Sequence, residues 1–527
     1  MKKIFGLFIS AMLVLLMVSC GSEKGTREYK DITMVDDNNR NYYEIFVGSF
    51  YDSDGDGLGD INGVTTKLDY IKDLGFNGIW LMPITAGASY HKYDVVDYMN
   101  VDSNFGTLDD FKNLLAKAHE KGIDIIIDLV VNHTSSRHPW FTEACSFIQR
   151  YGEPGGTYGK YYNFKQEAST GYSKVTGTSF YYECRFDGGM PDLNLDSEKV
   201  RNEIKNIMKF WLDLGCDGFR LDAVTSYYTG DINKNIEFLS WLNTEAKAIK
   251  KDAYIVGEAW VNNDNEIRQY YNSNIDSFFQ FTLSSGEGGV AKVVSDSNTQ
   301  RGKTFNSLMK QIDNTYNIGI LAPFLSNHDM NRIVNFVGSS NFAKVKFVQG
   351  VLSLFKGNPF VYYGEEIGMV SQASDPNRRL PIRWSSTDKT GTVTTLPTGG
   401  SISSNTYKFG SVEDNLKDPD SILNYYKYSN YIRNANPEIS RSNAKFFESY
   451  TTANANISVF QKTWNGKTIT IVVNFNEENS QTVKLDKSEL GFTEMTHYLC
   501  ATVTDIVKYN DSKSEVTLAP YSIAVFR

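Results

Sequence analysis

Short apolar runs alternate with amphipathic segments between residues 42 and 363 of the chain. Short runs that are apolar on both faces are typical of parallel strands covered by helices, and the amphipathic intervals are long enough to form those helices. We predict eight such strands: YYEIFV from Tyr42, FNGIWL from Phe76, IDIIIDLVV from Ile123, DGFRLD from Asp217, YIVGE from Tyr254, IDSFF from Ile275, ILAPFLS from Ile320 and FVYYG from Phe360.

The segment between the second and third runs illustrates why helices are predicted between the strands. Thr107 and Asp110 form a capping-box-like start, and Gly122 provides a stop. Apolar residues recur at helical spacing within this segment and again before Gly215. They are Phe111, Leu114, Leu115 and Ala118, and then Val200, Ile204, Ile207, Met208 and Trp211. Eight strand-and-helix units predict an α/β fold, a (β/α)8 TIM barrel.

Two intervals break this rhythm and indicate further domains. Residues 134–194 are rich in Gly, Tyr and Ser and predict a small domain inserted after the third strand. After Pro437 the pattern changes to alternating strands, with Asn465-Gly466 as a hairpin turn between VFQKTW and KTITIVVNF. We therefore assign 41–133 and 195–436 to the barrel, 134–194 to the insert and 437–527 to a C-terminal antiparallel β-sandwich.

The N-terminus has the pattern of a secretory signal. Lys2 and Lys3 precede an apolar run over residues 4–18, which is short for a transmembrane span. Residues 17–20 resemble a bacterial lipobox, in which Cys20 becomes lipidated. The alternative is simple cleavage and release. We predict a signal peptide over 1–19 and a lipidated tether over 20–40, which anchor an extracytoplasmic protein to the membrane or cell surface.

Composition narrows the class of protein. Hydrophobic residues make up 41% and charged residues 22% of the 527, which argues against a disordered or membrane-embedded chain. A net charge of −9 without clustered Lys and Arg argues against a nucleic-acid partner. Four cysteines follow Cys20, too few for a disulfide scaffold; Cys145 and Cys184 either pair or remain buried thiols. We expect a monomer.

Polar residues close several of the apolar strands. In a barrel of this kind the catalytic groups lie at the C-terminal ends of different strands. The residues found there are Asp128, Asn132 and His133 at the third strand, Arg220 and Asp222 at the fourth, Glu258 at the fifth, and Asn327, His328 and Asp329 at the seventh. Any one carboxylate alone is equally well explained as a structural ion pair, but three at separate strand ends favour catalysis.

Paired carboxyl groups that flank a bond are what glycoside hydrolysis requires. Arg220, two residues before Asp222 on one strand, faces the same way and is expected to keep Asp222 ionised. Glu258 is expected near that negative charge in a partly dry site, which raises its pKa and keeps it protonated. His133 and His328 are suited to sugar hydroxyls, with satisfied core histidines as the alternative.

These segments resemble the four signature regions of the α-amylase family, glycoside hydrolase family 13. The resemblance extends from IFVGSFYDSDGDG through MPDLN and GNPFVYYGEEIGM to LAPYSIAVFR. It implies a barrel (domain A), an inserted domain B and a β-sandwich domain C. It also implies Asp222 as nucleophile, Glu258 as general acid/base and Asp329 as the third carboxylate. The sugar contacts that it implies are Tyr93, His133, Arg220 and His328. Arg379, in RRLPIRW after the eighth strand, is a further candidate for sugar binding. Lys92 departs from the family, which commonly has Gly there.

The loop DSDGDGLGD after the first strand is rich in hard oxygen ligands. Asp52, Asp54, Asp56 and Asp60, with the carbonyl of Leu58, suit Ca²⁺. An EF-hand would need Glu at the twelfth position, which is Gly63. The loop is similar to one in oligo-1,6-glucosidase members of the family. The alternative is a solvated Asp/Gly turn without an ion. Asn132 is a candidate ligand of a second calcium site.

Two positions narrow the substrate within the family. MPDLN over 190–194 resembles the form in α-amylases intermediate between the oligo-1,6-glucosidase and neopullulanase groups. Ala223 follows Asp222, whereas Val there accompanies α-1,6 preference. Both favour endo-acting hydrolysis of α-1,4 bonds in starch and maltooligosaccharides. Neopullulanase-like, oligo-α-glucosidase-like and transglycosylating activities remain alternatives. A non-catalytic carbohydrate-binding or transporter-partner protein is disfavoured because all three carboxylates are present.

Overall fold

The computed structural model describes residues 32–295, 300–338, 340–371, 374–502 and 507–527. Residues 34–527 form one compact unit. The predicted signal peptide, Cys20 and the tether up to residue 31 lie outside the described residues. None of the helices in the described ranges is both long and apolar enough to cross a membrane.

Eight parallel strands form the central sheet. In chain order they are β1 (Tyr42–Ile45), β2 (Gly78–Leu81), β5 (Asp124–Leu129), β9 (Gly218–Leu221), β10 (Tyr254–Gly257), β11 (Ser277–Phe279), β12 (Ile320–Ala322) and β13 (Phe360–Tyr362). Each strand from β2 to β12 pairs with the strand before it in this order, and β13 pairs with β1. A parallel bridge between Phe324 and Phe360 joins the two ends of the sheet. The predicted (β/α)8 barrel is confirmed.

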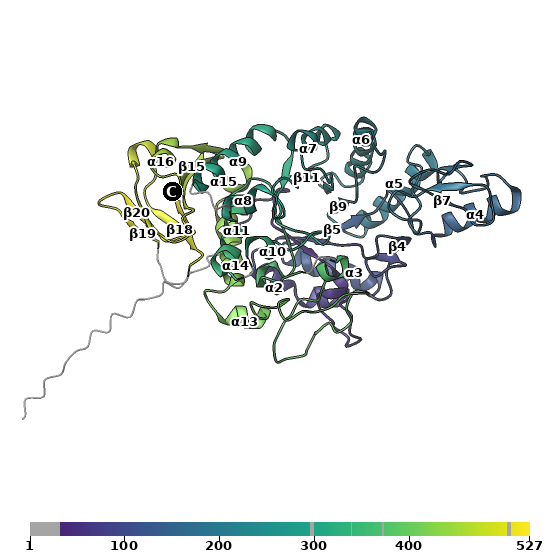
Figure 1. Cartoon of the computed structure of the whole chain (residues 1–527), viewed down its shortest axis with the longest axis horizontal. Helices are drawn as coiled ribbons and strands as arrows, with labels where there is room; N and C mark the ends of the chain where they lie inside the picture. Colours follow the sequence, from purple (N-terminus) through teal and green to yellow (C-terminus); the bar gives the residue numbers. More distant parts are fainter. Residues whose placement is uncertain (1–31, 296–299, 339, 372–373, 503–506) are drawn as a thin grey trace, which may run out of the picture. The chain divides into compact units, whose positions relative to one another are not determined.

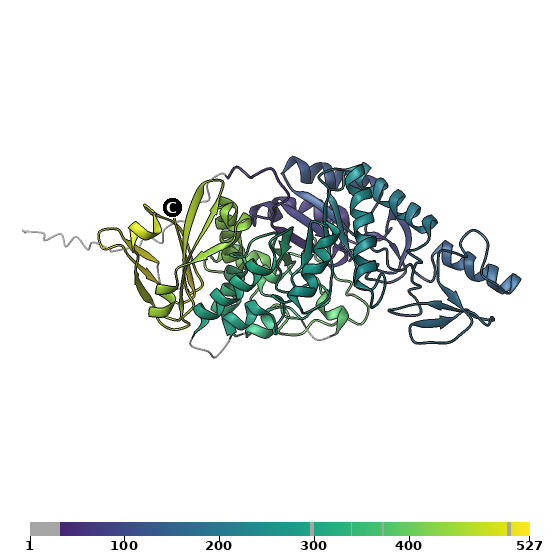
Figure 2. The same ribbon diagram turned by 90° about the horizontal axis from the view of Figure 1, so that it is seen from above.

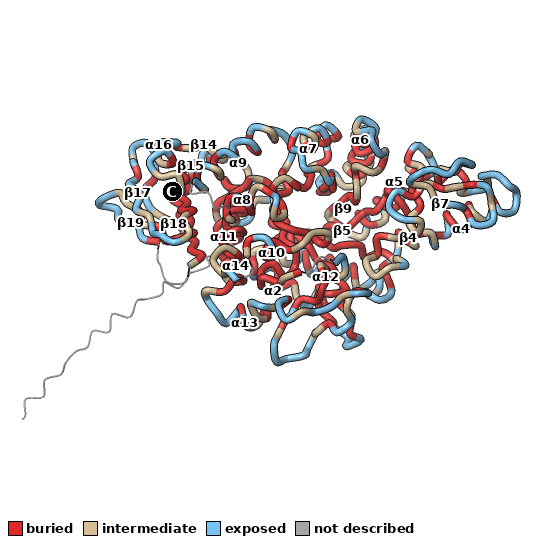
Figure 3. The backbone as a smooth tube through the Cα atoms, in the orientation of Figure 1, coloured by how far each residue is buried: buried red, intermediate tan, exposed pale blue. Residues whose placement is uncertain are grey.

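The strand register places the polar strand ends at one level. Arg220 on β9 lies opposite Asp128 on β5 and Val256 on β10, and Glu44 on β1 lies opposite Trp80 on β2. Alternate side chains fill the barrel interior, because successive residues of a strand point to opposite faces. This interior cluster comprises Tyr42, Trp80, Ile126, Tyr254, Val256, Phe279, Phe281, Ala322, Phe324 and Phe360. Figure 3 shows the buried strands, with β5 and β9 labelled.

Amphipathic helices cover the outside of the barrel (Figure 1). In α3 (Leu108–Glu120), Thr107 and Asp110 form the predicted capping box, and the four predicted apolar residues are buried. In α5 (Glu198–Asp213) all five predicted apolar residues are buried. The other long helices of the barrel are α6 (Ile232–Ile249), α9 (Arg301–Thr315), α11 (Phe342–Leu352) and α14 (Ile422–Ala435).

Shorter elements connect these strands and helices. They are η1 (Val47–Ser49), α1 (Ile61–Thr66), α2 (Leu68–Asp73), β3 (Thr85–Gly87), β4 (Val95–Val101), α7 (Asp264–Tyr270), η2 (Tyr271–Ser273), α8 (Gly289–Ser295), α10 (Val334–Val337), η3 (Glu365–Ile367), α12 (Asp375–Arg378) and α13 (Val412–Lys417).

The interval assigned to the insert contains α4 (Pro139–Tyr151) and a sheet of β6 (Phe164–Lys165), β8 (Tyr181–Glu183) and β7 (Tyr172–Lys174). These elements form a lobe beside the barrel (Figure 2). An isolated bridge between His133 and Asp192 ties the end of this segment to the end of β5. Cys145 and Cys184 are both free thiols, so the structure does not pair them.

The C-terminal region consists of antiparallel sheets. One contains β14 (Ala444–Phe446), β15 (Ile457–Trp464), β16 (Lys467–Asn474), β21 (Ser522–Phe526) and β18 (Met495–Cys500), and the other β17 (Gln481–Lys484), β20 (Glu515–Leu518) and β19 (Lys508–Asn510). Helices α15 (Glu438–Arg441), α16 (Glu448–Ala453) and α17 (Lys487–Leu490) accompany them. Asn465 and Gly466 form the predicted hairpin turn with φ of 48° and 72°.

Candidate active site

The predicted carboxylates come together at the C-terminal ends of the barrel strands. Asp128 lies on β5, Asp222 directly follows β9, and Glu258 directly follows β10. Asp329 lies in the loop after β12. Asp222 and Glu258 are buried, with exposed fractions of 8% and 5%. Burial of several carboxyl groups in one place is unfavourable without cations, so the neighbouring charges decide what this site can do.

Arg220 is the cation at the centre of the group. Its side chain is fully buried. Nη1 lies 2.7 Å from Oδ1 of Asp128 and 2.8 Å from Oδ1 of Asp222, and Nη2 lies 2.8 Å from Oε1 of Glu258. One guanidinium therefore lies between the two predicted catalytic carboxyl groups. It donates a hydrogen bond to Asp222 and forms an ion pair with Glu258, in which Nη2 and Oε1 make no hydrogen bond.

Glu258 also contacts the backbone beside Asp222. The N–H of Ala223 donates to Oε2 of Glu258 over 3.1 Å. Ala223 adopts a left-handed conformation with φ of 48°, which is uncommon for a residue other than glycine and is typical of functional sites. Burial raises the pKa of Glu258 to about 7, with the charges of Asp222 and Asp329 adding to the effect and Arg220 opposing it. Glu258 is thus suited to hold a proton near neutral pH.

Asp329 lies between two cations. Nε2 of His328 is 3.0 Å from its Oδ2, and Nη2 of Arg379 is 2.6 Å from its Oδ1. Although burial favours protonation, His328 and Arg379 outweigh it and hold the pKa of Asp329 well below its usual range. Asp329 therefore carries a negative charge opposite a protonated Glu258. Arg379 also forms an ion pair with Asp375 over 2.8 Å. The structure thus places Arg379, the predicted sugar-binding residue, beside the site carboxylate Asp329.

Tyr93 and His133 line the same site. The hydroxyl of Tyr93 lies 3.1 Å from Oδ2 of Asp128 and 2.7 Å from Nε2 of His328. His133 is buried, and its Nε2 has no hydrogen-bond partner among the described residues, which leaves it available to a ligand hydroxyl.

Lys92 occupies the position before Tyr93 at which the family commonly has Gly. Its φ is 64°, a conformation that favours glycine, and its Nζ lies 2.8 Å from Oδ2 of Asp102. The ion pair with Asp102 thus supports a backbone geometry in which Tyr93 still reaches His328.

Glu44 is a site residue that the sequence pattern did not single out. It lies within the apolar run of β1, is 1% exposed, and its Oε1 is 2.6 Å from Nδ1 of His328. A carboxylate within an otherwise apolar strand was the sequence signal that could have identified Glu44 as a site residue.

The Asp/Gly loop brings carboxylates together near the start of α1. Oxygen atoms of Asp52, Asp54 and Asp60 lie within 4.8 Å of one another. No Lys or Arg of the described ranges forms an ion pair with these three residues. Asp56 lies outside this group, and its Oδ1 accepts a hydrogen bond from the N–H of Leu58. Oxygen atoms on opposite sides of a calcium ion are about 5 Å apart, so the spacing fits such an ion.

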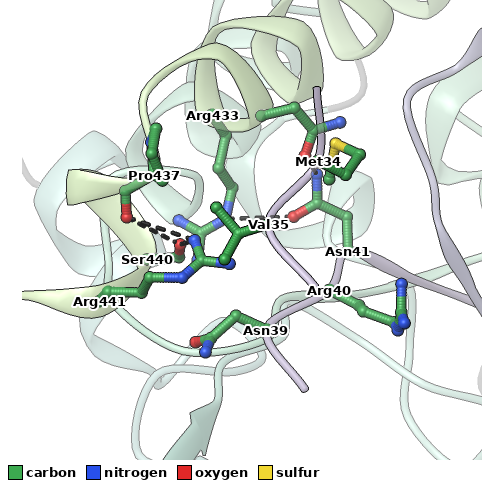
Figure 4. Close-up of a pocket in the computed structure, with 10 residues that line it drawn as sticks. Met34, Val35, Asn39, Arg40, Asn41, Arg433, Pro437, Ser440 and Arg441 are labelled. Atoms are coloured by element: carbon green, nitrogen blue, oxygen red, sulfur yellow. Dashed lines mark hydrogen bonds between the residues drawn. The ribbon is translucent and has the colours of Figure 1, made fainter. Parts of the chain in front are cut away.

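A different pocket lies before the N-terminal end of β1, on the opposite side of the strands from the carboxylates (Figure 4). Its volume is about 20 Å³, enough for a single water molecule. Arg433 and Arg441 line it, but Arg433 donates to Asn41 and to backbone carbonyls, and Arg441 pairs with Asp37. The pocket is too small for a substrate, and its two arginines link the segment before β1 to the segment around α15.

Several carboxyl groups at the C-terminal end of a parallel barrel are what a glycoside hydrolase requires. The model of the alpha amylase catalytic domain matches residues 44–442. The chain belongs to the α-amylase family, glycoside hydrolase family 13.

Individual relatives agree with this placement. The chain is 41% identical over 399 residues to "Alpha-amylase 3" of Dictyoglomus thermophilum, covering 73% of this chain and 75% of the relative. It is 31% identical over 464 residues to "Oligo-1,6-glucosidase" of Parageobacillus thermoglucosidasius, covering 73% and 81%. The solved structure of "Eubacterium rectale Amy13B" has a TM-score of 0.88 at 40% identity, covering 94% and 96%.

Proposed function

We propose that this protein hydrolyses α-1,4-glucosidic bonds within starch, maltodextrins and related α-glucans, with retention of the anomeric configuration. The contact of one Arg220 guanidinium with both Asp222 and Glu258 carries the proposal. Retaining glycosidases need two carboxyl groups close together, about 5 Å apart, whereas inverting enzymes keep them further apart for a water molecule.

Each carboxyl group then has a separate task. Asp222, which accepts a hydrogen bond from Arg220 and faces its positive charge, attacks the anomeric carbon as the nucleophile. Glu258 donates its proton to the leaving oxygen, and the bond between the anomeric carbon and that oxygen breaks. In the second step Glu258 takes a proton from water, whose oxygen displaces Asp222 and releases the sugar. The remaining residues bind the sugar or position the side chains that bind it; they are Asp329, Tyr93, His133, His328 and Arg379.

The α-1,4 preference rests on Ala223, on MPDLN over 190–194 and on similarity to a relative named as an α-amylase. The alternative is a neopullulanase-like, oligo-α-glucosidase-like or transglycosylating activity, favoured by the similarity to an oligo-1,6-glucosidase. A time course of products from amylose, pullulan, cyclodextrin and isomaltose discriminates between them. Early internal fragments of amylose support the proposal. Glucose as the first product of amylose, or isomaltose as the preferred substrate, would refute it.

The role of Asp222 is tested with Asp222→Asn. Reducing-sugar release from soluble starch should be abolished while starch binding is retained, because the amide keeps the shape but cannot act as the nucleophile. Asp213→Asn, at an exposed position that pairs with Lys209 on α5, is the matched control and should be fully active. Residual cleavage by Asp222→Asn would show that the assignment is wrong. Retention is tested by NMR, which should detect the α-anomer as the first product.

We also propose that the Asp/Gly loop binds Ca²⁺, with Asp52, Asp54, Asp56, Asp60 and the carbonyl of Leu58 as ligands. The three grouped carboxylates without a basic partner support this, because a cation would relieve their mutual repulsion. Purified protein should contain bound calcium and lose melting temperature with a chelator. Asp54→Asn should weaken that response, and Asp213→Asn should leave it intact. Protein without metal and without a chelator response would exclude the site.

For localisation, we propose a lipoprotein that is attached through Cys20 outside the cytoplasmic membrane and acts there as a monomer on polymeric glucan. Metabolic labelling with a fatty acid should mark the wild type but not Cys20→Ala, and the variant should appear in the medium. Unlabelled wild-type protein in the medium would instead indicate simple cleavage. Size-exclusion chromatography with light scattering tests the monomer.

A further inference from the structure

His328 lies between two carboxylates from different parts of the chain. Its Nδ1 is 2.6 Å from Oε1 of Glu44, and its Nε2 is 3.0 Å from Oδ2 of Asp329. The His328 side chain is fully buried and that of Glu44 is 1% exposed, so solvent does not screen the contact between them, whereas the Asp329 side chain is 28% exposed. The backbone N–H of His328 also points at Oε1 of Glu44, over 3.4 Å.

The proton count on the imidazole decides whether these contacts are favourable. A neutral imidazole has one N–H and one lone pair, so one of the two carboxylates would face a lone pair. An imidazolium donates from Nδ1 to Glu44 and places its positive charge beside Asp329, with which Nε2 forms an ion pair. With Nε2 protonated, the hydroxyl of Tyr93, 2.7 Å away, accepts from it or donates onward to Asp128.

The other groups that face His328 do not replace Glu44. Asp128 on β5 and Glu258 after β10 interact with its charge at longer range, Tyr93 contacts it directly, and the ring of Trp80 lies 5.6 Å away. Arg379 lies on the far side of Asp329. Glu44 is therefore the carboxylate in contact with Nδ1.

We propose that Glu44 is a positioning residue of the active site, which holds His328 as an imidazolium so that His328 keeps Asp329 charged and oriented toward the sugar. Consistent with this, burial alone would lower the pKa of His328, but Asp329 and Glu44 reverse the effect and raise that pKa to about 9. The proposal rests on the proposed glycosidase function for its consequence, but the protonation state itself is independent of substrate.

The test is the titration of His328 in the full-length protein labelled with ¹³C at the Cε1 atoms of histidine. The chain has six His, and His328→Gln identifies the signal of His328. In the wild type that signal should keep its protonated shift through pH 7. In Glu44→Gln, which retains an acceptor oxygen but loses the charge, the midpoint should fall by about 1 to 3 pH units. The wild-type kcat/KM already declines near pH 7 as Glu258 loses its proton, so kcat/KM of the variant should decline at a lower pH than this once the His328 midpoint falls to about 7 or below.

Glu366→Gln is the matched control. Glu366 is also buried and accepts from the hydroxyls of Tyr43 and Tyr70, but it has no contact with His328. Its substitution should leave both the titration and the pH profile unchanged. The proposal is overturned if wild-type His328 is neutral at pH 7, a result that does not require any variant to fold. It is also overturned if Glu44→Gln titrates as the wild type does. Loss of starch hydrolysis with the expected titration would instead count against the proposed function alone.

Discussion

Replacing Arg220 by Lys should slow catalysis while leaving the protein folded. The guanidinium reaches Asp128 and Asp222 from Nη1 and Glu258 from Nη2, whereas a lysine ammonium is a single point that cannot occupy both positions. We expect the contact with Glu258 to be lost. An opposite charge at this distance shifts a pKa by about 1–3 units. Since one unit is equivalent to about 1.4 kcal/mol, loss of this ion pair corresponds to a decrease of roughly 10- to 1000-fold in kcat.

The pH dependence of catalysis should also change in Arg220→Lys. Arg220 lowers the pKa of Glu258, although burial and the nearby carboxylates prevail. Loss of this contact should raise that pKa further, and because the protonated form of Glu258 is the active one, the alkaline limb should move to higher pH. The assay is kcat and kcat/KM on a chromogenic maltooligosaccharide from pH 5 to 10, with thermal unfolding measured in parallel. Arg268→Lys, at a half-buried position on α7, is the control. A folded Arg220→Lys enzyme with kcat within about twofold of wild type would refute the role of this contact, because even the smallest charge interaction of this kind predicts about a tenfold loss.

Two further predictions concern the proton on Glu258 and the N-cap of α3. The wild-type kcat/KM should fall as pH rises through about 7, because Glu258 with its raised pKa loses the proton it must donate, and a plateau extending to pH 9 would contradict this. Thr107→Ala should lower the free energy of unfolding by about 1 kcal/mol through loss of the N-cap of α3. Thr244→Ala, inside α6, should not destabilise the protein in the same denaturant titration, because Ala is a better helix former than Thr, and equal losses in the two variants would argue against a capping contribution.

The sequence by itself determined the features that depend on local pattern. The eight strands, the capping box of Thr107 and Asp110, and the Asn465-Gly466 turn follow from periodicity and backbone preference, which act over a few residues. The strand-end rule also located Asp222, Glu258 and Asp329, because a carboxylate that closes an apolar strand is visible without any knowledge of its partners.

The tertiary structure decided which charges meet, since contacts between distant segments leave no local signal. Glu44 and His328 are 284 residues apart, and Arg379 reaches Asp329 from a loop after a different strand. The bridge of Arg220 to Glu258 requires the register of β9 against β10. These pairings set the proton on Glu258 and the charge on Asp329, because burial magnifies the effect of each neighbouring charge. The pattern of apolar strands and amphipathic helices brings the carboxylates to one end of a barrel. The packing of that barrel then decides which carboxyl group holds a proton and which one is charged.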